Sequence, residues 1–343
     1  MKVTTDMIHP DLRQRGKWLR WLQPKASSAL LQGLSKVSQK VLKGRYTGPN
    51  RLREVWIPRE DGTQLRLCVF WPQERKQTTI PILAKYSKKN QWDASEEGVP
   101  GLLWLHGGGY ALGAPEQDVG YIDDFIRTTG SVVVAVDYRL SGEAAFPAAI
   151  EDAYQALKWM KAHGSEYGIR SDQLFVGGAS SGGGLTAALT LLARDRGEVN
   201  IAFQMPLYPM LDHRTSTNSA QDNDAPVWTA QYNEVAWQMY LKEIEREGEE
   251  IYPYAVPIMA TDYHNLPPTY TYVGTIEPFF DETMNYVSSL IDAGVPVHFK
   301  LYEGAFHAFD RIVPKANISR EARSHLLATY QYAAKHYFAE QNQ

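Results

Sequence analysis

Short apolar runs alternate with amphipathic stretches through most of the chain. Runs such as GLLWLH, SVVVAVDY and IAFQMPLY are apolar and partly β-branched, which is typical of strands buried on both faces. The stretch 148–163 instead places Ile150, Ala153, Leu157 and Met160 at helical spacing. Strands alternating with helices predict an α/β fold, with a mostly parallel sheet of about eight strands and helices on both faces.

The remaining predicted elements extend this alternation. The further strands are RLREVWIP and QLRLCVFWP, joined by a turn at EDG, then QLFVGG, PTYTYVG and PVHFKLYE, and the further helices lie at 184–196, 281–293 and 319–339. The polar stretch 74–99 is expected to form a surface loop or hairpin excursion.

Two segments stand outside the alternation. Residues 1–50 contain two predicted helices, 10–23 and 27–43, and residues 210–262 contain a helical AQYNEVAWQMYLKE. Ligands of open α/β sheets bind at the carboxyl edge of the strands. We therefore expect 1–50 to be an N-terminal helical cap segment and 210–262 a cap insertion in a catalytic domain at 51–343.

Composition and charge narrow the class of protein. The chain has 343 residues, 44% of them hydrophobic, and a net charge of -4, which does not favour a nucleic-acid partner. No apolar run approaches the roughly 20 residues that span a bilayer, and we expect the basic run 13–20 to be a solvated helix face without stable membrane association. The single cysteine, Cys68, and the absence of a visible secretory signal predict a cytoplasmic protein.

A strand-to-helix bend carries the first candidate chemistry. The sequence GASSG fits G-x-S-x-G at Ser180, a pattern in which small neighbours let a nucleophilic serine stand on a sharp turn. Ser181 fits less well, because Ala179 then takes a glycine position. A dinucleotide-binding loop is the alternative for these glycines, but no acidic residue ends the next strand to hold a ribose.

A serine nucleophile needs a base, an orienting acid and donors for the oxyanion. The glycines of HGGGY follow a buried strand and can turn N–H groups toward a substrate oxygen. His307 follows the last predicted strand and is the candidate base. Glu277, just after PTYTYVG, is the favoured acid, and Asp281 is the alternative, because it lies near a helix start and could be only an N-cap.

These motifs together resemble the hormone-sensitive-lipase-like, HGGG-type esterases of the α/β-hydrolase superfamily. The resemblance rests on HGGGY, VVVAVDYRLSGEAAFPAAIEDAYQALKWM, GGASSGGGLTAA, LPPTYTYVGTIEPFFDE and HAF, in the family's order. It implies an α/β-hydrolase fold under a helical cap, and hydrolysis of carboxylic esters, usually of short acyl chains. It also implies an oxyanion hole formed by the N–H groups of Gly108, Gly109 and Ser181, although Glu277 stands where the family usually has Asp.

The resemblance implies a small-molecule ester substrate and no cofactor, and we find no convincing metal-ligand cluster. Aromatic side chains of the insertion and the acid loop are candidates to line the substrate pocket: Trp228, Trp237, Tyr240, Phe279 and Phe280. The same three catalytic groups would serve an amidase, deacetylase or lactonase, and a non-catalytic small-ligand receptor of the same fold is a further alternative. A homodimer is compatible with the sequence.

Overall fold

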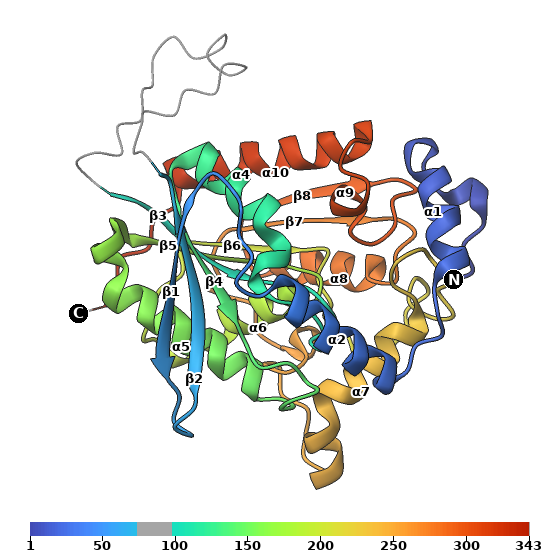
Figure 1. Cartoon of the computed structure of the whole chain (residues 1–343), viewed down its shortest axis with the longest axis horizontal. Helices are drawn as coiled ribbons and strands as arrows, with labels where there is room; N and C mark the ends of the chain where they lie inside the picture. Colours follow the sequence, from blue (N-terminus) through green and yellow to red (C-terminus); the bar gives the residue numbers. More distant parts are fainter. Residues whose placement is uncertain (74–97, 343) are drawn as a thin grey trace.

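The computed structural model describes residues 1–73 and 98–342. Its eight strands form one sheet in the order β1-β2-β4-β3-β5-β6-β7-β8, drawn in Figure 1. The strands are Arg51–Pro58 (β1), Gln64–Trp71 (β2), Val99–Leu105 (β3), Val132–Asp137 (β4), Ile169–Ala179 (β5), Phe203–Leu207 (β6), Thr269–Gly274 (β7) and Val297–Tyr302 (β8). Strand β2 runs antiparallel to β1 and β4, and every other neighbouring pair is parallel.

Helices connect the parallel strands and cover both faces of the sheet (Figure 1). They are Pro10–Leu22 (α1), Ser28–Leu42 (α2), Val119–Thr129 (α4), Ala148–His163 (α5), Ser181–Arg196 (α6), Ala230–Glu247 (α7), Phe280–Asp292 (α8), Phe309–Ile312 (α9) and Asn317–His336 (α10). Short 3-10 turns occupy Thr5–Met7, Pro115–Asp118, Gly164–Tyr167 and Pro257–Met259.

The two faces of the central strands enter separate layers of the core. On one face Leu103 packs in the same cluster as Leu157 of α5 and Leu185 of α6. On the other, Trp104 packs in a cluster with Phe125 of α4 and Tyr330 of α10. Burial on both faces explains why these strands are continuous apolar runs rather than alternating ones.

Most predicted elements agree with the structure within a few residues. The predicted β1 and the helix 148–163 have the bounds observed for β1 and α5, and the apolar residues at helical spacing in α5 are buried. Helix α4 is not among the predicted elements. Residues 74–97 of the predicted loop 74–99 fall outside the described residues; Gly98 and Val99 are described, and Val99 begins β3 rather than belonging to a loop.

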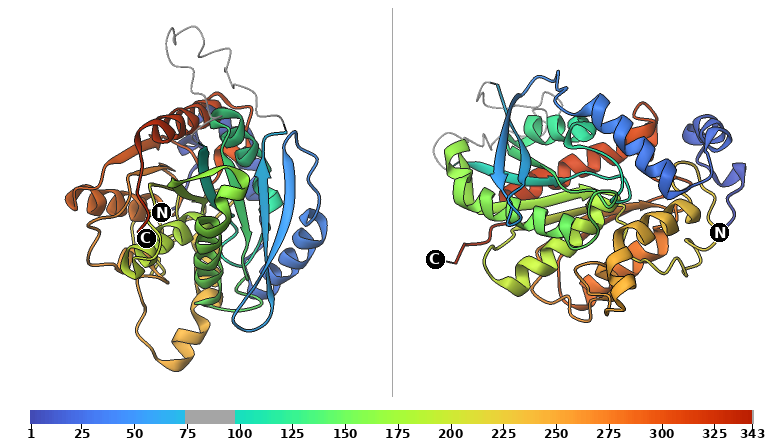
Figure 2. Two further views of the ribbon diagram at one scale, coloured as in Figure 1. Left: turned by 90° about the vertical axis from the view of Figure 1, so that its left-hand side faces the viewer. Right: turned by 60° about the horizontal axis from the view of Figure 1, so that its bottom comes forward.

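The N-terminal helices and α7 lie together beyond the carboxyl ends of the parallel strands (Figures 1 and 2). Helix α2 contacts α7, and the N–H of His9, just before α1, donates to the carbonyl of Gly304 at 2.9 Å. Gly304 belongs to the loop that follows β8. Both segments that interrupt the alternation therefore pack against the edge where open α/β sheets bind ligands.

Candidate active site

The strand-to-helix bend at Ser180 is as tight as its glycines suggest. Ser180 joins β5 to α6 with φ 61° and ψ -121°, a conformation that L-residues rarely adopt. A Cβ atom on Gly178 would lie 2.4 Å from the carbonyl oxygen of Gly182, and one on Gly182 would lie 2.0 Å from that of Leu105. Only glycine fits at both positions, so the bend can hold the serine at the start of a helix.

The imidazole of His307 links the serine to an acid. Its Nε2 lies 2.9 Å from the Oγ of Ser180, and its Nδ1 lies 2.5 Å from Oε2 of Glu277. A carboxylate has no proton to donate, so Nδ1 carries the hydrogen and Nε2 is free to accept the serine proton. The rings of Tyr208 and Phe279 meet the imidazole edge to face, at centroid distances of 5.1 Å and 5.0 Å, and fix its plane.

Glu277 is itself held by the backbone. It lies in the loop after β7, is fully buried, and its Oε1 accepts the N–H of Gly274 at 2.8 Å. A Cβ on Gly274 would come within 2.1 Å of the carbonyl oxygen of Ala305. The acid loop and the histidine loop therefore cross in direct contact, which explains how residues 30 positions apart pair.

Asp281, the alternative acid, faces another segment. Its Oδ2 accepts the N–H of Ser219 at 2.8 Å, and its own N–H donates to the Oγ of Ser219 at 3.0 Å. The structure thus brings Glu277 to the imidazole of His307, while Asp281 ties the start of α8 to the 210–262 insertion.

A glycine loop lies beside the serine. Gly108 and Gly109 have φ angles of 130° and 61°, and the carbonyl of Gly108 accepts two N–H groups of the following turn. A Cβ on Gly107 would lie 3.2 Å from the Cβ of Ser180, so the loop and the nucleophile are adjacent. Among the described loop and turn hydrogen bonds, none uses the N–H groups of Gly108, Gly109 or Ser181. These donors remain available to an oxygen of a bound molecule.

His106, which precedes the glycines, has a structural role. Its ring stacks on Tyr138 with centroids 4.3 Å apart, and the Tyr138 hydroxyl donates to the His106 carbonyl at 2.7 Å. Burial lowers the pKa of His106, so its ring is neutral near neutral pH.

The five aromatic pocket candidates divide between three places. The rings of Phe279 and Trp228 approach the imidazole of His307, at centroid distances of 5.0 Å and 6.3 Å. Trp237 and Tyr240 instead pack on Tyr110, the residue after the glycine loop, at 5.5 Å and 4.0 Å. Phe280 is partly buried against the core cluster of the sheet's other face.

Three residues near the site were not singled out from the sequence. Tyr110 stacks on Tyr240 beside the glycines, and Tyr208, with φ 35°, packs on the imidazole. Tyr110 ends the HGGGY motif and Tyr208 directly follows β6, and these positions are the one sequence signal that could have identified them. Glu282, fully buried beside the acid loop, accepts the N–H of Leu211 at 2.7 Å. Burial raises the pKa of Glu282 well above its usual range.

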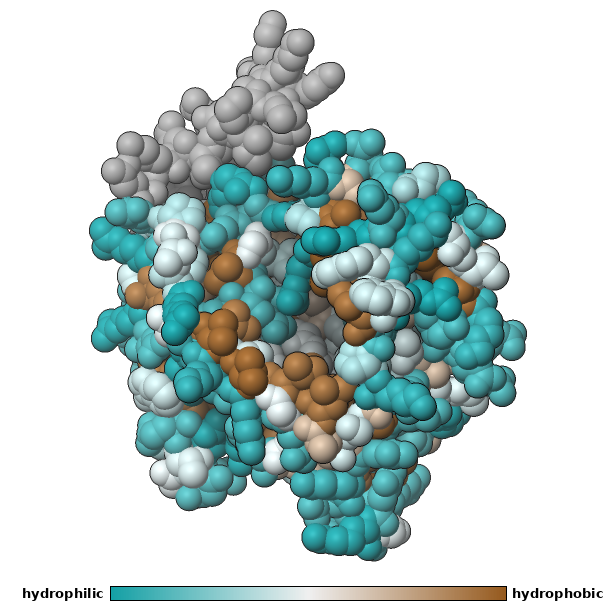
Figure 3. Space-filling model, turned by 45° about the vertical axis from the view of Figure 1, so that its right-hand side comes forward, coloured by the Kyte–Doolittle hydropathy of each residue, from teal (hydrophilic) through white to brown (hydrophobic). Residues whose placement is uncertain are grey.

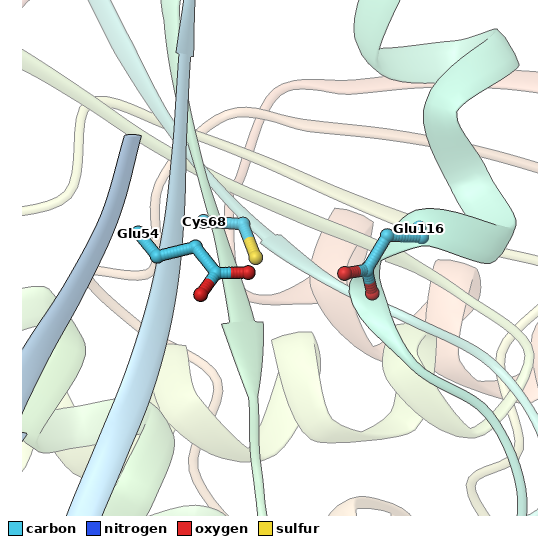
Figure 4. A group of neighbouring side chains, drawn as sticks. All are labelled: Glu54, Cys68 and Glu116. Carbon is cyan, nitrogen blue, oxygen red and sulfur yellow. The ribbon is translucent and has the colours of Figure 1, made fainter. Parts of the chain in front are cut away.

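In the described part of the chain, one group of three side chains brings potential metal-ligand atoms close together. Figure 4 shows Glu54, Cys68 and Glu116 pointing toward one another, with their donor atoms within 4.8 Å. Arg66 lies among them and donates to Glu54 at 2.7 Å and to Glu116 at 2.8 Å and 3.0 Å. Its guanidinium already supplies the positive charge that these carboxylates need, and burial raises the pKa of the Cys68 thiol. The group is therefore an ion cluster centred on the buried Arg66, with Glu54 at its solvent-exposed edge.

Comparisons with known proteins agree with this arrangement. A family model described as alpha/beta hydrolase fold matches residues 102–311. The chain is 33% identical over 211 residues to the esterase LipI of Mycobacterium tuberculosis, an overlap of 61% of this chain and 65% of LipI. It is 29% identical over 301 residues to an ethyl acetate hydrolase of Pseudomonas putida, which covers 87% of both chains. The solved structure of a bacterial heroin esterase superposes with a TM-score of 0.82 at 31% identity, over 97% of this chain and 99% of that one.

The matched region contains the glycine loop, the serine bend, Glu277 and His307, and these occur in the order serine, acid, histidine along the chain. The chain belongs to the hormone-sensitive-lipase-like, HGGG-type esterases of the alpha/beta hydrolase fold.

Proposed function

We propose that this esterase hydrolyses its substrate through an acyl-enzyme on Ser180, with His307 as the base and Glu277 as the acid that orients it. The observation that carries this assignment is the continuous contact from Ser180 Oγ to His307 Nε2 at 2.9 Å and from Nδ1 to Glu277 at 2.5 Å. A serine hydroxyl is a weak nucleophile unless a neighbouring base removes its proton.

The geometry supports a two-step reaction. In the first step the Ser180 oxygen attacks the ester carbonyl carbon while His307 takes the hydroxyl proton, and the carbonyl oxygen becomes an oxyanion. The unused N–H groups of Gly108, Gly109 and Ser181 stabilise that charge. His307 then gives its proton to the leaving alcohol, and water hydrolyses the acyl-enzyme by the same route.

Residues 1–50 and 210–262 would form the cap over this site. Arg20 of α1 pairs with Asp224 of the insertion at 2.9 Å, and the Asp224 carboxylate also accepts the N–H of Val3 at 2.8 Å. The hydroxyl of Tyr232 donates to the carbonyl of Pro24 at 3.1 Å. The two segments are thereby joined to each other as well as to the sheet edge.

We infer a preference for short acyl chains, because bulky rings crowd the serine and glycine loops. A Cβ on Gly109 would lie only 2.4 Å from the Trp228 ring, and Phe279 covers the imidazole. The relative from Pseudomonas putida is named for ethyl acetate, a small ester. The free thiol of Cys68 is buried, which supports our expectation of a reducing, cytoplasmic compartment. A homodimer stays a prediction, which light scattering can test.

Hydrolysis of p-nitrophenyl esters of increasing chain length tests the proposal. We expect acetate and butyrate esters to react faster than long-chain esters, and Ser180→Ala to abolish turnover. Ser181→Ala is the matched control, since it removes a hydroxyl one residue away and keeps the backbone N–H. Faster hydrolysis of anilides or lactones than of esters would reassign the reaction, and activity that persists in Ser180→Ala would refute the nucleophile.

A further inference from the structure

Helix α2 presents an apolar stripe to solvent. Leu30, Leu34, Val37 and Val41 recur at the four-three-four spacing of one helix face, and the last three are 44%, 61% and 51% exposed. Leu31 is buried and faces the protein. A single exposed apolar residue needs no explanation, but a continuous stripe on a surface helix does.

Helix α1 has the same division between an inner and an outer face. Its inner face is fixed by Leu12, which is fully buried, and by Gly16, where an added Cβ would lie 3.3 Å from Phe306. Its outer face carries Trp18, Trp21 and Leu22, and Trp21 is 80% exposed. Tryptophan prefers membrane–water interfaces, where its ring is buried and its N–H stays hydrated.

The sequence around these side chains is strongly basic, although Asp11 lies in the first turn of α1 and Asp224 pairs with Arg20. Residues 12–53 contain eleven Lys and Arg residues, while all 39 acidic residues of the sequence lie elsewhere. Arg20 and Lys43 pair with carboxylates of other segments. Six exposed cations in and beside the two helices form no salt bridge among the described residues: Arg15, Lys17, Lys25, Lys36, Lys40 and Arg45.

We propose that the exposed face of α1 and α2 docks reversibly onto membrane surfaces that contain anionic lipid. Apolar and tryptophan side chains surrounded by unpaired cations are the features that bind helices in the interfacial plane of such membranes. None of the described helices combines the length and apolarity needed to cross a bilayer, so the association is peripheral. The basic run of α1 alone predicts only a solvated helix face. The exposed apolar residues on both α1 and α2 favour membrane docking instead.

Charge and placement favour a lipid surface over the other occupants. A second copy of the chain would bring two sets of unpaired cations together, which costs energy. The exposed apolar residues also belong to two separate helices, α1 and α2, which lie beyond the same edge of the sheet (Figures 1 and 2). That spread suits a broad anionic surface better than a single acidic peptide, which would bind along one helix or groove.

Docking by this face would present the active-site side of the molecule to the membrane. Figure 3 is turned so that the right-hand side of Figure 1, where α1 lies, comes forward. It shows brown apolar residues gathered beside a hollow in the surface. Helix α1 also packs on Phe306, the neighbour of His307. An ester dissolved in the bilayer could then reach the site from the docked face. The docking itself does not depend on the catalytic assignment, because it rests on the outer faces of α1 and α2.

Co-sedimentation with lipid vesicles tests the docking. We expect the full chain to sediment with vesicles of phosphatidylcholine and phosphatidylserine, to bind pure phosphatidylcholine far more weakly, and to be released by salt. Lys36→Gln with Lys40→Gln should weaken partitioning about 25-fold, since each cation contributes about 1 kcal/mol near an anionic surface. Trp21→Ala should weaken it several-fold through lost apolar contact.

Matched controls come from helices outside the proposed docking face. Lys335→Gln on α10 and Ile291→Ala on α8 remove an exposed cation and an exposed aliphatic side chain, and neither should change partitioning. Equal thermal unfolding midpoints for all variants exclude misfolding. No sedimentation at low salt, equal binding to neutral vesicles, or equal loss in the controls would overturn the proposal. A dimer in light scattering that Val37→Ser dissolves would assign the face to self-association instead.

Discussion

Replacing Glu277 by glutamine should disable the base without disturbing the loop that holds it. In the native protein Oε1 of Glu277 accepts the N–H of Gly274 at 2.8 Å. A glutamine at this position keeps that bond only if its amide oxygen faces Gly274. Its NH₂ group then faces Nδ1 of His307, where the carboxylate oxygen now lies at 2.5 Å.

This substitution reverses the direction of the hydrogen bond between residue 277 and Nδ1 of His307. An NH₂ group can only donate, so Nδ1 must become an acceptor and the ring proton must move to Nε2. Nε2 can then no longer accept the proton of Ser180, which lies 2.9 Å away. The corresponding acid-to-amide change in serine proteases lowers kcat by about 10⁴, or about 5.5 kcal/mol of transition-state free energy.

The assay is steady-state hydrolysis of p-nitrophenyl butyrate by Glu277→Gln and by Asp281→Asn. We expect kcat to fall by about 10³–10⁴ in Glu277→Gln with little change in KM, because the change alters proton transfer and not the pocket. Asp281→Asn keeps a side chain that can still bond Ser219 and should lose less than about tenfold. If Asp281→Asn abolishes turnover while Glu277→Gln retains it, the assignment of the acid is refuted.

The remaining predictions concern the glycine loop, the core and a buried acid. Gly109→Ala forces a Cβ to within 2.4 Å of Trp228 at φ 61°, so kcat should fall about 10²–10³ in ester hydrolysis, and unchanged kcat would contradict this. Leu157→Ala empties a fully buried position of α5 and should lower the free energy of unfolding in urea by about 2–5 kcal/mol; a loss below about 1 kcal/mol would show that the site collapses. Burial raises the pKa of Glu282, so the folded chain keeps a proton that the unfolded chain releases above about pH 4.3. Stability to urea should therefore fall as pH rises through the range between the two pKa values, and Glu282→Gln should make that fall shallower; an unchanged pH slope would contradict the assignment.

Local pattern was enough to predict the regular elements and the loops that carry chemistry. The continuous apolar runs that became β3 and β4, and the helical spacing in α5, each specify one element without reference to the rest of the chain. Helix α4 is less visible, because VGYIDDFIRTT mixes β-branched residues with a glycine. Its buried face, including Ile122 and Phe125, is evident only once the sheet is present.

Contacts between distant segments were harder to predict. The sequence favoured Glu277 but kept Asp281 as an alternative acid, because both follow β7. The contact between the loop after β7 and the loop after β8 decides which of them reaches His307. Arg66 of β2 binds Glu54 of β1, Asp137 at the end of β4 and Glu116 of the turn Pro115–Asp118, so no local sequence motif predicts this cluster. The exposure of Trp21 likewise depends on which face of α1 the rest of the fold covers.

Covalent labelling gives the most direct test of the central claim, that a base-activated hydroxyl at position 180 attacks the substrate. A fluorophosphonate reacts with activated serines and leaves a phosphonyl group whose position peptide mass spectrometry can read. We predict one adduct per chain, on Ser180, formed as ester hydrolysis is lost, absent in Ser180→Ala and formed far more slowly in His307→Ala. An adduct on Ser181, or full hydrolytic activity in a chain labelled at Ser180, would contradict the account.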